Sequence, residues 1–117
     1  MERAVRLRKN RQFQYVYHRG KSSACREVVL LHAKSARLQV GFSVSRKVGG
    51  SVVRNRTKRR LREQFRKLMP QLRPGLYVIV AREAAARADS NALHDAMRYL
   101  ARKQGLLLQP AVQGAGK

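Results

Sequence analysis

The stretch that decides the fold is "GGSVVRNRTKRRLREQFR", residues 49–66. Its apolar residues recur at the spacing of an amphipathic helix, yet it carries seven arginines and lysines against a single acid, Glu63. Like charges on one helix repel each other. The segment therefore needs a core on which its apolar side packs and an anion that neutralises its other side.

We expect Ser51 to cap a helix that runs from Val52 to about Met69 and is stopped by Pro70. At about 100° per residue, one side of this helix collects the residues expected to be buried: Val53, Thr57, Leu61, Gln64, Phe65 and Leu68. The opposite side collects Asn55, Arg59, Arg62 and Arg66. One face should pack on a core while the other presents a cationic ridge.

Upstream, a helix from about Asn10 to Arg19 is expected, with Asn10 as its cap and with Phe13, Val16 and Tyr17 on one face. "REVVLLHA" (residues 26–33) and "LQVGFSVS" (residues 38–45) are typical of strands joined by a turn at residues 35–37. The second strand alternates strictly. Its two faces are Val40, Phe42 and Val44 on one side and Gly41, Ser43 and Ser45 on the other.

Downstream, "PGLYVIVA" predicts a turn and a buried strand, and "EAAARADS" a loop or short helix. Ser90 should cap a last helix from Asn91 to about Lys103, with a buried stripe of Leu93, Met97 and Leu100. This order predicts one α+β domain, a compact two-layer sandwich with three helices on a sheet of about four strands. Its ordered core should span about residues 6–103, followed by a flexible tail at 104–117.

The charge narrows the possible partners. The 27 basic and 6 acidic residues give a net charge of +21, and the isoelectric point is about 11.8. Such self-repulsion is relieved by a polyanion, either nucleic acid or an acidic membrane surface. We expect no membrane span and no signal peptide, because the long apolar run that each requires is absent. Cys25 is the single cysteine, so no disulfide forms within the chain, and a reducing cytoplasm is expected.

Protein-based catalysis finds no support in the sequence. The six acids include no paired-carboxylate spacing that would hold two metal ions, and the three histidines are scattered. HxxxH, CxxC and P-loop motifs are absent. We therefore expect no catalytic residue and no metal ligand in this chain. It looks like a binding protein, or a subunit whose catalyst lies elsewhere.

The basic segment is suited to phosphate. The Gly49–Ser51 turn leads into a helix N-terminus whose N–H groups favour anions, and Arg46 and Lys47 stand just before it. Cations at that end are disfavoured by the helix dipole, so Arg54 and Arg56 imply an external anion. The alternative is a face that is merely solvated, but such a face usually carries both positive and negative side chains. A nuclear-localisation run at residues 56–60 would not need the apolar face.

A second constellation combines aromatic and small residues. Phe13 and Tyr17 lie one turn apart, and Gly41, Ser43 and Ser45 form a small, polar strand face. A single RNA strand could lie across such a face with its bases stacked on the rings. The alternative is that Phe13 and Tyr17 only cover the core.

The segment "SVSRKVGGSVVRNRTKRRLRE", residues 43–63, closely resembles the signature of the bacterial ribonuclease P protein subunit. The most distinctive part is Arg54-Asn55-Arg56 followed by Lys58-Arg59. "RLRKNRQFQYVYHRGK" near the N-terminus, "GLYVIVARE" and the C-terminal helix fit the same family in order and spacing. The resemblance covers about residues 6–103.

The resemblance implies a compact domain with a left-handed βαβ crossover, a fold also found in a domain of a small-subunit ribosomal protein. It implies that the catalytic RNA subunit, with Mg²⁺, removes the 5′ leader of precursor tRNA, and that no further protein partner is required. The RNA subunit would be bound by Arg46, Lys47, Arg54, Asn55, Arg56, Lys58, Arg59, Arg60, Arg62 and Arg66. The leader would be bound by Phe13, Tyr17, Leu31, Ser43 and Ser45.

The sequence departs from the family pattern at two positions. Gly50 stands where the family usually has Asn, which should loosen the entry to the basic helix. Leu31 stands where the family can carry an aromatic residue facing the leader, so apolar contact would replace stacking there.

Three other function classes compete with this interpretation. The strongest is a small basic ribosomal or RNA-chaperone protein with no part in cleavage. A DNA-binding module is disfavoured because nothing suggests a dimer or paired half-sites. A membrane-surface helix is disfavoured because the basic helix lies inside a domain with strands and further helices.

Overall fold

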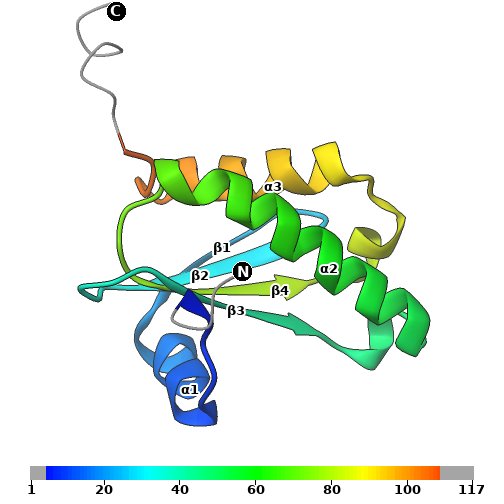
Figure 1. Ribbon diagram of the computed structural model, residues 1–117, viewed down its shortest axis with the longest axis horizontal. Helices are drawn as coiled ribbons and strands as arrows, with labels where there is room; N and C mark the ends of the chain where they lie inside the picture. Colours follow the sequence, from blue (N-terminus) through cyan, green and yellow to red (C-terminus); the bar gives the residue numbers. More distant parts are fainter. Residues whose placement is uncertain (1–4, 109–117) are drawn as a thin grey trace, which may run out of the picture.

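A four-stranded sheet separates one helix from two others in the computed structural model, which describes residues 5–108 (Figure 1). The strands are β1 (Lys21–Ala24), β2 (Val28–Ala33), β3 (Gln39–Val44) and β4 (Leu76–Ala81). The helices are α1 (Asn10–Arg19), α2 (Ser51–Leu68) and α3 (Ser90–Lys103). Short 3₁₀ turns lie at η2 (Arg46–Val48), η3 (Met69–Gln71) and η4 (Glu83–Arg87). The predicted α+β class is confirmed.

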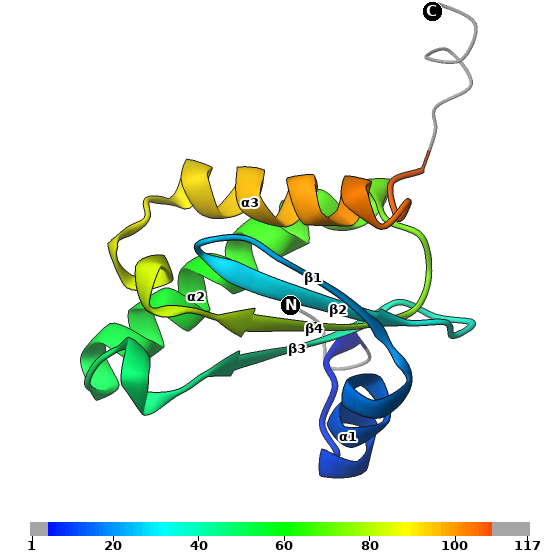
Figure 2. The same ribbon diagram turned by 180° about the vertical axis from the view of Figure 1, so that it is seen from behind.

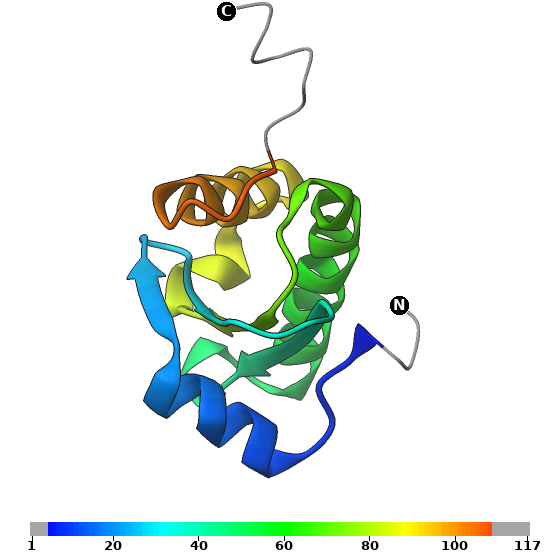
Figure 3. The same cartoon turned by 90° about the vertical axis from the view of Figure 1, so that its left-hand side faces the viewer.

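The sheet is mixed. Its strand order is β1-β2-β4-β3, with β2 antiparallel to both neighbours and β3 parallel to β4. The connection from β3 through α2 to β4 is therefore a crossover, and Figures 1 and 3 show that it is left-handed. Nearly all such crossovers are right-handed. The resemblance to the family predicted this exception, which general chain geometry would not have done.

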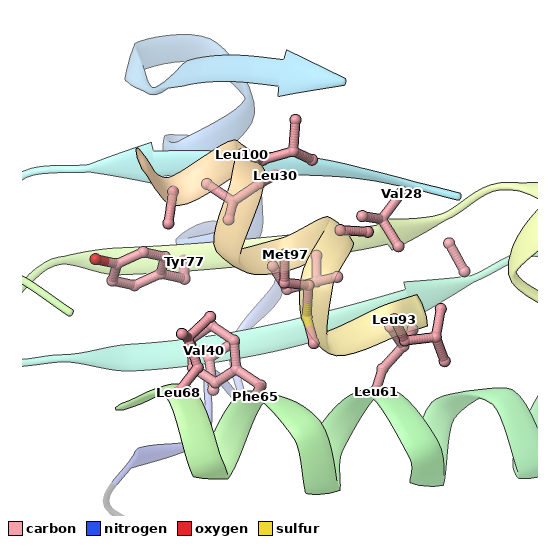
Figure 4. Packing of buried hydrophobic residues seen from close by; sticks show 14 of the residues in the cluster. Val28, Leu30, Val40, Leu61, Phe65, Leu68, Tyr77, Leu93, Met97 and Leu100 are labelled. Atoms are coloured by element: carbon pink, nitrogen blue, oxygen red, sulfur yellow. The ribbon is translucent and has the colours of Figure 1, made fainter. Parts of the chain in front are cut away.

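The larger core lies between the sheet and the helices α2 and α3. Figure 4 shows side chains from α2 and α3 meeting those of β2, β3 and β4, among them Phe65, Met97 and Tyr77. Burial of such large apolar side chains is the main stabilising term. The predicted stripe of α2 is confirmed, since Thr57, Leu61, Gln64, Phe65 and Leu68 are buried, while Val53 is half-buried.

A smaller apolar cluster lies on the other face of the sheet, under α1. It joins Val16 of α1 and Leu7 to the strand residues Leu31, Ala33, Leu76 and Val78. Figure 2 shows α1 beneath the end of the sheet where β3 and β4 begin, and no helix covers the face near their carboxyl ends. The sheet is thus fully covered on one face and partly covered on the other.

The three predicted helix caps were each wrong by one residue. α2 is preceded by Gly50, so Ser51 is its first helical residue and no side chain caps it. α3 is capped by Asp89, whose carboxylate accepts the Ala92 N–H at 2.8 Å, in place of Ser90. Lys9 precedes α1 in place of Asn10. Each difference is one residue, within the usual spread of helix boundaries.

Two segments differ from the sequence prediction. β1, "KSSA", is a polar and largely exposed edge strand that pairs with β2, and its composition gave no strand signal. The predicted flexible tail begins too early, because Leu106 is only 6% exposed and Leu108 N–H donates to Gln71 O. The tail expected at 109–117 lies outside the described residues. Between residues 5 and 108, no helix combines the length and apolarity needed to cross a membrane.

Candidate nucleic-acid interface

The polar side chains of α2 divide among three directions. Asn55, Arg59 and Arg66 are exposed on the side away from the core, as predicted, and Val52 beside them is 76% exposed. We call Asn55, Arg59 and Arg66 the α2 ridge. Its side chains carry no hydrogen bond or ion pair within residues 5–108. The two guanidinium groups are therefore available to phosphate oxygens.

One flank of α2 faces β3. Arg54 is half-buried, and its Nε donates to Gly49 O at 3.2 Å. Lys58 and Arg62 line a small cavity of about 80 Å³ together with Phe13 and Gly41. The prediction that Arg62 lies on the ridge was therefore wrong. The neighbouring β3 edge draws this arginine toward the sheet, where it adds positive charge close to the α1 aromatics.

The other flank of α2 faces η4. Arg60 is half-buried and donates from a terminal nitrogen to Ala88 O at 3.3 Å. Arg56, one turn earlier, is also half-buried, and its Nε is enclosed without a hydrogen-bond partner among the described residues. A buried donor without a partner costs about 1–3 kcal/mol. Arg56 is therefore the cation on this flank that gains most from an added acceptor.

The entry to α2 is set by two glycines with different constraints. Gly49 has φ +157°, and a Cβ there would lie 2.8 Å from Val53 Cγ1, so this position needs glycine. Gly50 has extended backbone and open space around it, so it would accept a side chain. Arg46 and Lys47 are exposed on η2 just before this turn. The cations predicted at the helix entry are thus accessible.

The α1 aromatics lie on the opposite side of β3 from the α2 core. A Cβ at Gly41 would collide with the ring of Phe13, so glycine makes room for that ring against the strand. Phe13 is half-buried, whereas Tyr17 is 42% exposed. Phe13 is therefore mainly a packing residue, and Tyr17 is the ring that could stack on a base.

The remaining predicted strand residues have separate environments. Ser43 is half-buried on the α1 face, and Ser45 is exposed just beyond the end of β3. Leu31 is only 8% exposed and packs in the cluster under α1, so the predicted contact of Leu31 with a ligand is not supported. The sequence analysis missed Val29 and Val80, which pair across β2 and β4 and stay half-buried on this face. Alternation from Leu31 could have identified Val29.

We define the sheet-face site as Tyr17, Val29, Ser43 and Val80. It combines an exposed ring, two partly exposed apolar side chains and a small hydroxyl. Apolar and aromatic surface with few directional groups suits bases without strong sequence readout. We treat these four residues as a candidate surface for a single strand of nucleic acid.

Among the described residues, two titratable groups have clearly shifted pKa values, and both lie outside these surfaces. Burial raises the pKa of Tyr77, whose hydroxyl donates to Arg73 O at 2.7 Å. Burial also lowers the pKa of His32; its hydrogen bond to Pro74 O opposes this, and the charge of Lys34 adds to it. These shifts follow from packing at the end of the sheet where β4 begins.

Potential metal ligands do not gather in the described part of the chain. Within residues 5–108, no three histidine, cysteine, aspartate or glutamate side chains lie close enough together to hold a metal ion. The described residues therefore do not fit a Mg²⁺ site, and we assign no step to a metal ion bound by this protein alone.

The chain was compared with protein families and curated proteins. Residues 1–105 match the model of the family "Ribonuclease P". A protein of Symbiobacterium thermophilum named "Ribonuclease P protein component" is 42% identical over 111 residues, which cover 92% of this chain and 96% of that protein. A protein of the same name from Exiguobacterium sp. is 39% identical over 102 residues, covering 86% of this chain and 90% of that protein.

Solved structures agree with this result. A mutant RNase P protein of Staphylococcus aureus, described as defective in mRNA degradation activity, has a TM-score of 0.83 and 29% identity, covering 91% of this chain and 92% of that one. The RNase P protein of Thermotoga maritima has a TM-score of 0.74 and 30% identity, with 83% and 96% covered. The same fold therefore accompanies the similarity in sequence.

Proposed function

Since this chain belongs to the ribonuclease P protein family, we propose that it binds the RNA subunit of ribonuclease P through the α2 ridge and the 5′ leader of precursor tRNA through the sheet-face site. The chain is the protein component of an enzyme complex whose other partner is an RNA subunit. The relatives do not support an independent ribosomal or RNA-chaperone protein.

Cleavage is assigned to the RNA subunit in this proposal. Mg²⁺ held by that RNA would supply the metal-ion chemistry of phosphodiester hydrolysis. The protein's own residues bind and orient: cations neutralise phosphates, and aromatic and apolar groups hold unpaired bases. We place the complex in the cytoplasm, where a free, half-buried Cys25 would remain reduced.

The observation that carries the RNA-subunit proposal is the arrangement of charge on α2. Arg59 and Arg66 project from the exposed side of a helix whose other side is fixed in the core. Arg54, Arg56, Arg60 and Arg62 flank them with partly buried stems, which places their charges with less loss of side-chain entropy. A rigid cationic surface of this kind suits the phosphates of a folded RNA.

The leader proposal is supported by the open part of the sheet face. The helix α1, which carries Tyr17, packs on the same face of the sheet as Val29 and Val80, and the alternation of β3 puts Ser43 on that face too (Figure 2). Lys58 and Arg62 add positive charge at the β3 edge nearby. A leader is present only in the precursor, so contacts to it must favour precursor over mature tRNA.

The leader proposal is tested in a complex reconstituted from this protein and a ribonuclease P RNA. Tyr17→Ala should weaken the binding of precursor tRNA about tenfold, as expected for one lost base stack. The binding of mature tRNA should be unchanged. Tyr99→Ala is the matched control, because Tyr99 is 47% exposed on α3, on the other side of the sheet. If Tyr17→Ala weakens the binding of both tRNAs equally, or if the two variants have equal effects, the sheet-face site does not bind the leader.

A further inference from the structure

A large open cavity lies outside both proposed surfaces. It has a volume of about 740 Å³ and opens at the end of the sheet where β1 and β4 begin. Figure 3 looks at this end, with α1 below the sheet, the C-terminal end of α3 above it and the turn after β2 between them. A second cavity of about 460 Å³ lies beside the N-terminal half of α1.

The two cavities have no lining residue in common, but both are lined by one flank of α1 and by the turn after β2. Gln12, Tyr15 and Arg19 follow each other at helical spacing along one flank of α1, with Gln12 in the smaller cavity and the other two in the larger. The turn after β2 forms the other wall, with Lys34 in the larger cavity and Arg37 in the smaller. Because they follow the same helix flank and the same turn, we consider the two cavities together and call them the outer groove. Tyr17 lies on the opposite flank of α1, so the helix separates the outer groove from the sheet-face site.

The outer groove is uniformly cationic. Of its described lining residues, nine are arginine or lysine and none is acidic: Arg6, Arg8, Lys9, Arg11, Arg19, Lys21, Lys34, Arg37 and Arg73. The five acids among residues 5–108 all lie elsewhere, at Glu27, Glu63, Glu83, Asp89 and Asp95. A concave surface of one charge sign concentrates anions. Among the described residues, no acidic side chain lines the groove to neutralise this charge.

Arg73 in the groove is held in place by hydrogen bonds within the protein. Arg73 donates its backbone N–H to Leu106 O at 2.8 Å and its Nε to Gly105 O at 3.1 Å, and its carbonyl accepts the Tyr77 hydroxyl. Its terminal nitrogens have no partner among the described residues. A guanidinium held in this way binds phosphate with less ordering cost than a free surface arginine.

The groove also holds an aromatic ring. Tyr15 is 49% exposed beside Arg19 on the rim of the larger cavity. His32 in the same lining is held by the 3.1 Å contact of its Nε2 with Pro74 O. An exposed ring beside several cations matches an unpaired base with its flanking phosphates, whereas a duplex hides the faces of its bases.

We propose that the outer groove is a second binding site for single-stranded RNA, with a base stacked on Tyr15 and phosphates bound by Lys21, Lys34 and Arg73. The proposal does not depend on the leader assignment, because α1 separates the two sites. The α1 flank that lines the groove spans about 11 Å between Gln12 and Arg19, so the groove is not limited to one phosphate.

The test uses the full chain and a fluorescent single-stranded RNA oligonucleotide, with anisotropy as the readout. Lys21→Glu with Lys34→Glu should weaken binding about tenfold more than Lys67→Glu with Arg87→Glu. All four residues are exposed, and both pairs change the net charge equally. Equal effects of the two pairs would show that only net charge matters and would overturn the site.

Tyr15 variants test the stacking contact directly. Tyr15→Ala should weaken the binding of the oligonucleotide about tenfold. Tyr15→Phe should keep most of the wild-type affinity, because the aromatic ring makes the contact. Exposure of Tyr15 makes either substitution compatible with folding. Ultraviolet crosslinking of 4-thiouridine RNA should give adducts on the peptide that contains Tyr15. Absence of such adducts, with unchanged affinity of Tyr15→Ala, would contradict the proposal.

Competition identifies the ligand class. Unlabelled single-stranded RNA should displace the probe from wild type far better than the same RNA as a duplex, a mononucleotide or inorganic phosphate. If the duplex or the small anions compete equally well per phosphate, the groove is a general anion surface and the single-strand proposal is wrong.

Discussion

Replacing Gly41 with alanine tests how α1 is held on the sheet. A Cβ at this position would run into the Phe13 ring, with Cε1 at 2.6 Å, and would lie 3.2 Å from Leu7 Cβ. Real side chains do not approach so closely, so the ring, and with it α1, must shift. Overpacking of this kind costs about 1–3 kcal/mol. We expect Gly41→Ala to destabilise the fold by about 2 kcal/mol.

The thermal shift follows from the size of the domain. The 104 residues from 5 to 108 correspond to an unfolding entropy of about 0.2 kcal/mol/K, so 2 kcal/mol should lower Tm by about 9 °C. Circular dichroism melting in a fixed sulfate concentration measures this. The measurement assumes a single cooperative transition, which coincident near- and far-ultraviolet melts would verify.

A double-mutant cycle identifies the cause. Phe13→Ala removes the ring that collides with the new methyl group, so Gly41→Ala should cost much less in a Phe13→Ala background, with a coupling of about 1–2 kcal/mol. Gly50→Ala is the control, because a Cβ there meets nothing within 4 Å. If Gly41→Ala costs the same with and without the Phe13 ring, the packing of α1 through Phe13 is wrongly described.

Three further predictions address the entry to α2, the half-buried His32 and the net charge. Gly50→Asn should raise Tm, because asparagine can cap α2 and restricts the unfolded chain, with a gain of about 0.5–1 kcal/mol; a lower Tm would contradict the open space seen there. His32 has a lowered pKa when folded, so the unfolded chain binds more protons as the pH falls through 6.5, and stability should fall with it. His32→Gln should remove the His32 contribution to the change in Tm between about pH 8 and about pH 5. An unchanged pH profile of Tm in this variant would show that His32 makes no such contribution. Sulfate should raise Tm because an anion relieves the net charge of +21, more than chloride does at equal ionic strength; equal effects of the two salts would indicate screening alone.

The sequence predicted most of α2 correctly because its apolar side is long and strictly periodic. Thr57 and Gln64 follow that period and are buried although they are polar, and Thr57 satisfies its hydroxyl by donating to Val53 O at 2.8 Å. The alternation of β3 was equally informative, since Val40 packs toward α2 and Gly41 toward α1. Periodicity fixes which side of an element faces inward.

The candidate site was less predictable, because it depends on which elements become neighbours. Arg62 and Arg66 are one turn apart and look equivalent in the sequence, yet only Arg62 meets the β3 edge and the Phe13 side of α1. Leu31 and Val29 alternate onto the same face, and the position of α1 alone decides that Leu31 is covered and Val29 is partly open. The outer groove joins residues from four distant parts of the chain, so no local pattern indicated it.

The central claim is that the α2 ridge binds the RNA subunit, and the salt dependence of that binding tests it most directly. The dissociation constant of protein and ribonuclease P RNA is measured against salt concentration for wild type, for Arg59→Ala with Arg66→Ala, and for the control Lys67→Ala with Arg87→Ala. Loss of two phosphate contacts should make the slope of log K against log salt shallower by about two units in the ridge variant only. Identical slopes for the ridge and control variants would show that the RNA subunit binds elsewhere.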